Sequence, residues 1–380
     1  MEIRTSRPED LPQIEKLVVS RMDPSDGVDA RLLMTDPDAG CDWVGVADDG
    51  GRIVSTLTLM DETVTLAGLD IPAGQIEQVA TDTEYEGKGL VRGLMDWAND
   101  RSAERGHLLQ FVMGVPYFYR QFGYVYSIPI KQTRPLVRKP EAVAGHTIRR
   151  ATAADIPVLD QLQDEAQRGV DLRVGHGTPC WRWLIDRTGS ITWIVDRDGT
   201  PVATGRSTPE EEGDVVLGEI AGIDDDAVKA LVALVNPAEA GERHPALENF
   251  LGARRADLDQ YMVRIPSIPR LLEHLRPVFA QRLRGHDPDE VVLGFYRTHV
   301  RFRWDGEEIG PYEWGGTMLG PGSQGGAGIA PDLLAPLLFG PHGMDGLRRR
   351  FSDVYPGPKE DLMTRLFPPV TSDLLTFYLP

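Results

Sequence analysis

The sequence is poor in cysteine and has no long apolar run. Its 380 residues include only two cysteines, Cys41 and Cys180, which offer neither a disulfide framework nor a CxxC metal pair. No apolar stretch approaches the roughly 18 residues that a membrane helix needs. The first residues also lack a basic segment followed by an apolar one, which a secretory signal would show. These absences predict a soluble protein of the reducing cytoplasm.

Positive charge is also scarce. Forty Lys and Arg residues stand against 58 Asp and Glu residues, which gives a formal net charge of −18. This balance argues against nucleic acid or an anionic membrane as partner and is compatible with cationic small molecules. The eight histidines form no HxxxH or comparable pair, so we predict no metal site.

An internal repeat divides the first two thirds of the chain. The segment IRTSRPEDLPQI at residues 3–14 returns as IRRATAADIPVL at residues 148–159. Residues 43–59 and 193–207 both show the pattern of a strand, an acidic-glycine turn and a second strand. Each copy also carries a predicted capping box at its first helix, Ser6-x-x-Glu9 and Thr152-x-x-Asp155. The chain therefore predicts two copies of one mixed α/β fold.

A third unit begins near Tyr261. A helical pattern over residues 268–283 is interrupted by Pro277. An alternating pattern follows in residues 291–306, where Val300, Phe302 and Trp304 should share one face of a strand. The glycine-rich stretch 315–328 lacks a GK[ST] ending, so we expect a flexible connection there and no phosphate cradle. We predict three units with the bounds 1–145, 146–262 and 263–380.

The stretch from Gly74 to Gly106 predicts an anion-binding site. Its pattern is typical of a strand over 76–80, a loop over 81–88 and a helix over 89–105. Glycines let the backbone approach a phosphate, and the N–H groups at a helix start point toward it. The predicted binding residues are Gly87, Lys88, Gly89, Leu90, Val91 and Arg92.

This stretch resembles motif A of the GCN5-related N-acetyltransferases (GNAT). The motif has Gln or Arg, two residues, Gly, one residue, then Gly or Ala, and the sequence EGKGLV fills it with Glu86 and Val91 as departures. Downstream, VPYFYRQFGY at residues 115–124 resembles the family's FYxxxGF element and matches its tyrosine to Tyr119. The resemblance implies acetyl-CoA as co-substrate. It also implies that backbone groups of Val79, Ala80 and Thr81 pair with the pantetheine arm.

Direct acetyl transfer to an amine needs an acid for the leaving thiolate and a base for the amine. Tyr119 is the candidate acid, because a phenol stays protonated at neutral pH; a packed ring without a proton-transfer role is the alternative. Glu77 is a candidate base, because it precedes Val79 by two residues and so should share its strand face. An ordinary solvated or paired carboxylate is the alternative for Glu77.

The whole chain resembles the enhanced intracellular survival (Eis) acetyltransferases, which join a GNAT domain, a degenerate copy and a sterol-carrier-like unit. This resemblance implies a hexamer, with the terminal carboxylate, here that of Pro380, as base. In the second copy, residues 224–226 are three aspartates that would repel pyrophosphate, so we predict a structural partner that shapes the acceptor cleft. We also expect Asp23, Asp26 and Asp29 to line that cleft.

Two functions follow from these patterns. The first is transfer of acetyl from acetyl-CoA to a primary amine of a polycationic acceptor: an aminoglycoside, a polyamine or a lysine side chain. The second is a non-catalytic protein, in which Glu86 disables the cofactor site and the C-terminal unit binds a lipid or a partner. The retained Gly87, Gly89 and Tyr119 favour the enzyme.

Overall fold

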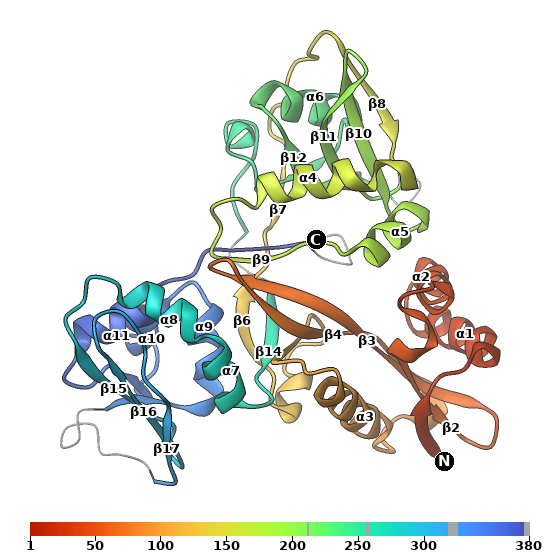
Figure 1. Ribbon diagram of the computed structural model, residues 1–380. Coiled ribbons are helices and arrows are strands. Elements are labelled where there is room, and N and C mark those ends of the chain that lie inside the picture. Colours follow the sequence, from red (N-terminus) through yellow and green to blue (C-terminus); the bar gives the residue numbers. More distant parts are fainter. Residues whose placement is uncertain (211–212, 256–258, 318–325, 376–380) are drawn as a thin grey trace.

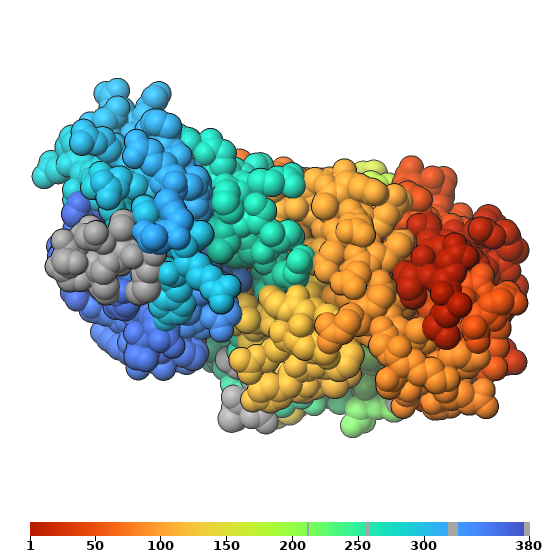
Figure 2. Space-filling model, turned by 90° about the horizontal axis from the view of Figure 1, so that it is seen from below, coloured from red at the N-terminus to blue at the C-terminus, as the bar shows by residue number. Residues whose placement is uncertain are grey.

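The computed structural model describes residues 1–210, 213–255, 259–317 and 326–375. Three mixed or antiparallel sheets with helices packed on them make up the chain (Figure 1), which confirms the predicted mixed α/β class. Seen from below, the N-terminal and C-terminal parts lie at opposite ends of the molecule (Figure 2). None of the helices in the described residues is long and apolar enough to cross a membrane.

The first sheet has the strand order β1-β2-β3-β4-β5-β14-β6. Only the β4–β5 pair within this order is parallel. The α1 and α2 helices pack on one face and α3 on the other (Figure 1). The bounds are β1 Glu2–Thr5, β2 Val44–Asp48, β3 Ile53–Leu66, β4 Leu69–Thr81, β5 Leu109–Val112, β6 Val125–Pro129, β14 Gln260–Arg264, α1 Leu11–Arg21, α2 Pro24–Thr35 and α3 Leu90–Glu104.

The second sheet has the strand order β8-β10-β11-β12-β13-β7. Its one parallel pair, β12–β13, holds the same place in the order as β4–β5 in the first sheet. The bounds are β7 Thr133–Pro135, β8 His146–Arg150, β10 Ile191–Arg197, β11 Thr200–Ser207, β12 Val216–Gly222, β13 Glu239–Gly241, α4 Ile156–Ala166, α5 Thr178–Asp186 and α6 Asp225–Val235.

One strand of each of these two sheets lies across a predicted bound of the sequence. β7 precedes all other strands of the second sheet along the chain and pairs antiparallel with β13. β14 follows the second sheet along the chain but inserts between β5 and β6 of the first. The predicted bounds at 145/146 and 262/263 therefore divide the sequence but do not divide the sheets.

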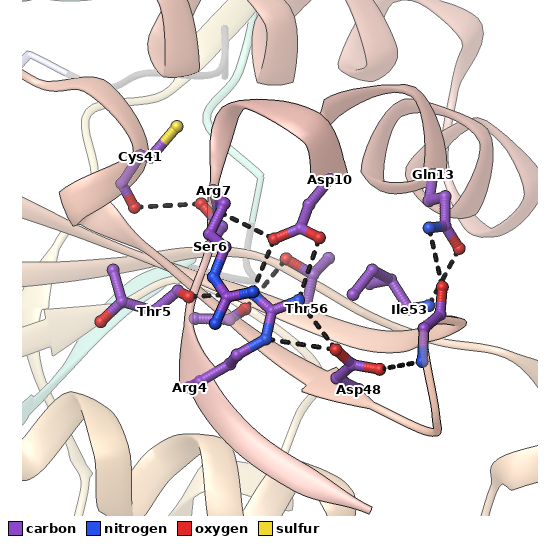
Figure 3. A network of polar contacts seen from close by, with 12 residues as sticks. Arg4, Thr5, Ser6, Arg7, Asp10, Gln13, Cys41, Asp48, Ile53 and Thr56 are labelled. Atoms are coloured by element: carbon purple, nitrogen blue, oxygen red, sulfur yellow. Dashed lines mark hydrogen bonds and ion pairs between the residues drawn. The ribbon is translucent and has the colours of Figure 1, made fainter.

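An arginine network recurs at the start of both sheets. The Arg4 guanidinium binds Asp10 at 2.7 Å and Asp48 at 2.9 Å (Figure 3). Arg149 binds Asp155 and Asp196, both at 2.8 Å, in the corresponding places of the repeat. Burial alone would raise the pKa of Asp10, but the Arg4 guanidinium outweighs it and lowers that pKa. Each arginine thus joins the first strand, the first helical turn and the second strand.

The predicted capping boxes are half right. The Asp155 carboxylate accepts from the Thr152 backbone N–H at 2.8 Å, as predicted. In the first copy the Asp10 carboxylate accepts from the Arg7 N–H at 2.7 Å, so the Ser6–Glu9 box was wrong by one residue. Ser6 donates its hydroxyl to the Cys41 carbonyl oxygen instead (Figure 3). The repeat aligns Arg7 with Thr152 and Asp10 with Asp155, so only the aspartate of the capping box is common to both copies.

The C-terminal part forms the third sheet, in the order β17-β16-β15-β18-β19. The predicted interruption at Pro277 is confirmed, because one helix ends at His274 and the next begins at Arg276. Residues 318–325 of the glycine-rich stretch lie outside the described residues. The bounds are α7 Ile268–His274, α8 Arg276–Leu283, β15 Asp289–Gly294, β16 His299–Trp304, β17 Glu313–Gly315, β18 Ala327–Ile329, α9 Leu334–Phe339, α10 Gly343–Arg348, β19 Val354–Tyr355 and α11 Glu360–Leu366.

The chain returns to the first two sheets near its end. β20 (Ser372–Leu374) pairs with β9 (Leu172–Val174), which pairs in turn with the end of β3. A buried ion pair fastens this strand, since the Arg243 Nε lies 2.5 Å from the Asp373 carboxylate. Short 3-10 helices complete the chain: η1 Pro8–Asp10, η2 Gly40–Trp43, η3 Thr83–Tyr85, η4 Phe118–Phe122, η5 Ala153–Asp155, η7 Pro245–Leu247 and η8 Pro331–Leu333.

The Arg4 network makes a measurable contribution to stability. We expect Arg4→Ala to lower the free energy of unfolding by about 2 kcal/mol at pH 7. This value lies between the contributions of exposed and of fully buried ion pairs. Arg7→Ala, which removes an exposed arginine side chain three residues away, should change it by less than about 0.5 kcal/mol. Because the Asp10 pKa is depressed in the folded state, the Arg4 effect should shrink as pH falls through the acidic range. Equal denaturation midpoints for the two variants would contradict the role of the network.

Candidate active site

A bulge in β4 sets the geometry of the site. Gln78 has a φ of 48°, and the register passes from Thr58↔Glu77 to Thr56↔Ala80. Gln78 and Val79 therefore share one opposing residue. The side chain of Val79 packs with Ile76 in the cluster under α3, whereas Ala80 packs with the α1 side. The prediction that Glu77 and Val79 share a face was wrong, because the bulge reverses the alternation between them.

β4 and β5 separate just beyond their short parallel pairing. Their register begins at Ala73↔Leu109 and ends at Ile76↔Val112, five residues before β4 ends at Thr81. The β5 side of the following β4 segment is free of strand pairing among the described residues. This segment contains Val79, Ala80 and Thr81, the residues predicted to meet the pantetheine arm. An extended chain could bind to this open edge as an added strand does.

The loop after β4 has the geometry of an anion site. Gly87 and Gly89 have φ values of 72° and 80°, and nothing lies within 4 Å of a Cβ placed on either. Such left-handed glycines turn successive N–H groups outward. The first backbone bond of α3 runs from the Gly93 N–H to the Gly89 carbonyl, so the N–H groups of residues 90–92 precede the helical bonding pattern. The predicted helix over 89–105 agrees with α3 within one residue at each end, whereas the strand predicted over 76–80 is only the last part of β4, which begins at Leu69.

The carboxylates of this loop are paired with arginines from elsewhere. Glu86, the departure from motif A, binds Arg21 at the end of α1 with a separation of 2.5 Å. Arg52 binds Asp82 at 2.7 Å and Glu84 at 3.3 Å. Two predicted ligands, Lys88 and Arg92, contact groups other than carboxylates. The Lys88 ammonium lies 4.1 Å from the Tyr85 ring centre, and Arg92 donates to Gln121. The loop is therefore not the negative surface that Glu86 suggested in the sequence.

Tyr119 lies at the point where β4 and β5 part. Its side chain is buried in η4 and packs in the same cluster as Ile76 and Val112. Burial, with the nearby charge of Glu77 second, raises the pKa of Tyr119 well above its usual value. Its hydroxyl has no hydrogen-bond partner among the described residues. A neutral phenol at this place can donate a proton.

Four carboxylates gather on the α2 side of the same sheet. Glu77 accepts from Gln75 at 2.5 Å, and burial raises the pKa of Glu77 to about 8 despite that bond. Burial, followed by the charges of Asp61 and Glu77, raises the pKa of Glu62 on β3 to about 8. Asp26 and Asp29 belong to α2 and are buried.

Two of the aspartates predicted to line the acceptor cleft, Asp26 and Asp29, belong to helix α2 and not to a loop. Asp23 caps that helix, and its N–H donates to the Asp26 carboxylate. Asp29 is paired with Arg187 of the second copy at 2.7 Å, and burial still raises the pKa of Asp29 to about 6. Such a cluster favours a cationic ligand, because added positive charge would relieve the repulsion among these groups.

The second sheet repeats the bulge without the phosphate loop. Glu219 in β12 has a φ of 50°, and the β11–β12 register shifts between Thr204 and Arg206. Only two residues, Ile223 and Asp224, separate β12 from α6. The Asp224 carboxylate accepts from the Ala227 N–H at 2.8 Å and so occupies the helix start itself. This position holds a fixed carboxylate, in agreement with the predicted loss of phosphate binding.

The bulge of the second copy also differs in its side chains. Glu219 binds Arg206 at 2.7 Å and His176 at 3.1 Å. Burial alone would raise the pKa of Glu219, but Arg206 and His176 lower it well below its usual range. The His176 Nδ1 lies 3.3 Å from the Cys180 sulfur. No group of three or more His, Cys, Asp or Glu side chains in the described ranges could hold a metal ion.

Sequence reasoning missed three residues that shape this site. Arg21 and Glu62 are single charged residues on a helix and a strand, and no local pattern marks them. Gln78 was missed because a left-handed residue within a strand has no reliable signature outside glycine. The predicted base Pro380 lies outside the described residues.

Comparisons with known proteins agree with this geometry. Residues 2–127 match the family described as acetyltransferase (GNAT) domain. No curated protein sequence matches the chain. Among solved structures, a protein from Enterococcus faecalis V583 named as a probable N-acyltransferase has a TM-score of 0.72 at 16% identity, covering 99% of each chain.

Two further structures resemble the whole chain. A GCN5-related N-acetyltransferase from Kribbella flavida has a TM-score of 0.70 at 16% identity and covers 99% of this chain and 100% of its own. Eis1 from Mycobacterium abscessus has a TM-score of 0.64 at 13% identity and covers 100% of both. At these identities the likeness shows the fold. With the domain match, it supports an acyltransferase that depends on acetyl-CoA.

The Arg21–Glu86 pair should control cofactor affinity. We expect Arg21→Ala to weaken acetyl-CoA binding about tenfold, because an unpaired Glu86 would repel the pyrophosphate. Glu86→Gln should bind at least as tightly as the natural protein, and the double variant should recover most of the loss. Calorimetric titration of the four proteins with acetyl-CoA measures this cycle. A loss in Arg21→Ala that Glu86→Gln fails to restore would show that neutralisation is not its role.

Proposed function

We propose that the chain is an N-acetyltransferase that transfers an acetyl group from acetyl-CoA directly to a primary amine of a polycationic acceptor. The observation that carries the acceptor class is the cluster of Glu62, Glu77, Asp26 and Asp29 beside the open edge of β4. The net charge of −18 would add a long-range attraction for cations. Aminoglycosides, polyamines and lysine side chains share the required chemistry.

We further propose that residues 1–145 form the catalytic unit and 146–262 a degenerate copy of it. The similar strand orders, the repeated arginine network and the two bulges support a duplication. Residues 263–380 would form a sterol-carrier-like unit. The hexamer that the resemblance implies stays a prediction, as does the cytoplasmic location.

In the proposed reaction the neutral amine attacks the thioester carbonyl carbon. A C–N bond forms, the C–S bond breaks, and the CoA thiolate takes a proton from the Tyr119 hydroxyl. The open edge at Val79, Ala80 and Thr81 would hold the pantetheine arm, and the start of α3 would hold the pyrophosphate. The amine loses its proton to a base, for which Glu77 and the carboxylate of Pro380 are the two candidates.

Tyr119→Phe tests the proposed acid and the proposed function together. We expect turnover to fall by roughly 10²–10⁴-fold, because the leaving thiolate would lack its proton donor. Acetyl-CoA affinity should stay within about twofold, since only one hydroxyl is lost. Turnover is followed as thiol release with spermidine or an aminoglycoside as acceptor. No thiol release by the natural protein with any of these amines would overturn the proposed acceptor class.

The pH profile separates the two candidate bases. Because the Glu77 pKa is raised to about 8, its carboxylate form grows as pH rises toward 9. If Glu77 is the base, kcat/KM should rise through pH 8 and Glu77→Gln should lose this part of the rise relative to the natural protein. The acceptor amine titrates equally in both proteins and so cancels in their ratio.

Removal of Leu379 and Pro380 is the matched experiment for the other base. If the terminal carboxylate is the base, this truncation should abolish turnover while Glu77→Gln retains it. Circular dichroism and acetyl-CoA titration of the truncated protein control for folding. Full activity of both variants would leave neither group as the base and would favour a water relay.

A further inference from the structure

A cavity lies at the junction of the first sheet and the C-terminal part of the chain. Its volume is about 440 Å³, within the range of small-molecule sites. One wall comes from β6 and β14, and the other from the helices α9 and α10 with the turn that follows them. The two parts are in close contact, because a Cβ on Gly340 would come within 2.9 Å of the Ser127 carbonyl oxygen.

The cavity walls are largely apolar. They include Val125, Leu333, Pro336, Leu347 and Phe351. Phe351 is 43% exposed and Tyr126, also in the lining, is 36% exposed. Large apolar side chains gathered around a cavity mark a binding site more often than the same side chains scattered over a surface.

Two arginines line this cavity without a carboxylate partner among the described residues. Arg120 lies over the ring of Tyr117, with 5.5 Å between the guanidinium carbon and the ring centre. Arg350 faces His342, whose pKa is lowered by burial and then by the Arg350 charge. In a chain whose other arginines commonly bind acidic groups, two unpaired guanidinium groups beside apolar walls leave positive charge available to a ligand.

Two carboxylates, those of Asp332 and Asp353, also belong to the cavity lining. Asp353 and Asp332 both raise the pKa of Tyr296, after burial. Among the described residues neither aspartate forms an ion pair with Arg120 or Arg350, so both guanidinium groups can bind an added carboxylate.

We propose that this cavity binds a small amphipathic carboxylate, with the apolar chain against Val125, Leu347 and Phe351 and the carboxylate on Arg350 and Arg120. A carboxylate accepts two parallel N–H bonds from a guanidinium group, and the apolar walls favour an alkyl chain over a short acid. The site is independent of the proposed acetyl transfer, because it uses neither the phosphate loop nor the carboxylates beside Glu77.

Calorimetric titration of the full chain with decanoate tests the proposal. We expect saturable binding at one site, and about tenfold weaker binding in Arg350→Gln, because a charge-assisted hydrogen bond pair is lost. Arg349→Gln is the matched control, since Arg349 is exposed, adjacent and outside the cavity lining. It should bind decanoate as the natural protein does. Acetate and decyltrimethylammonium should not bind at the same concentrations.

Three results would overturn the proposal. One is the absence of saturable decanoate binding, and another is equal binding by Arg350→Gln. The third is self-association of the natural protein that Arg350→Gln abolishes while decanoate has no effect, because the cavity would then be part of an interface between copies. Loss of acetyl transfer alone bears on the proposed function and leaves this site unaffected.

Discussion

The insertion of β14 between β5 and β6 is the constraint on which the rest of the molecule depends. Each short parallel pair, β4–β5 and β12–β13, needs a further strand on its outer edge, because an unpaired edge would leave backbone groups without partners. In the second sheet that strand is β7, which directly precedes the rest of the sheet along the chain, and in the first sheet it is β14. The second sheet therefore uses only residues 133–241, whereas the first sheet is completed by residues 260–264, after the chain has left the second sheet. Backbone pairing thus holds this later part of the chain to the first sheet.

The same bulge in two sheets leads to two different chemical outcomes. In β4 it turns Val79 toward α3 and leaves the backbone edge open beside Tyr119. In β12 the bulged residue is Glu219, whose charge is held by Arg206 and His176. The loop that follows decides the rest, because eight residues lie between β4 and α3 whereas two lie between β12 and α6. Only the longer loop can turn its N–H groups outward around left-handed glycines.

The acidic composition acts locally through burial. On a surface, Glu77 and Glu62 would be ordinary carboxylates, but their burial on one face raises each pKa to about 8. Asp29 keeps a pKa of about 6 because Arg187 offsets part of the same effect. In contrast, the carboxylates of the loop at residues 82–89 are exposed or half-buried and are paired with arginines. Position in the fold therefore separates two sets of acidic groups that the sequence lists without distinction.

The sequence by itself determined the local parts of the protein. Glycine spacing, helical periodicity and the recurring IR segment identified the glycine loop, α3 and the repeat, because these depend on contacts between near neighbours in the chain. Tyr119 was found by resemblance of a short motif. The tertiary structure alone decided the partner of Glu86, the face of Glu77 and the insertion of β14 into the first sheet. Each of these depends on residues tens to over a hundred positions apart, or on a bulge, and no short-range pattern records such contacts.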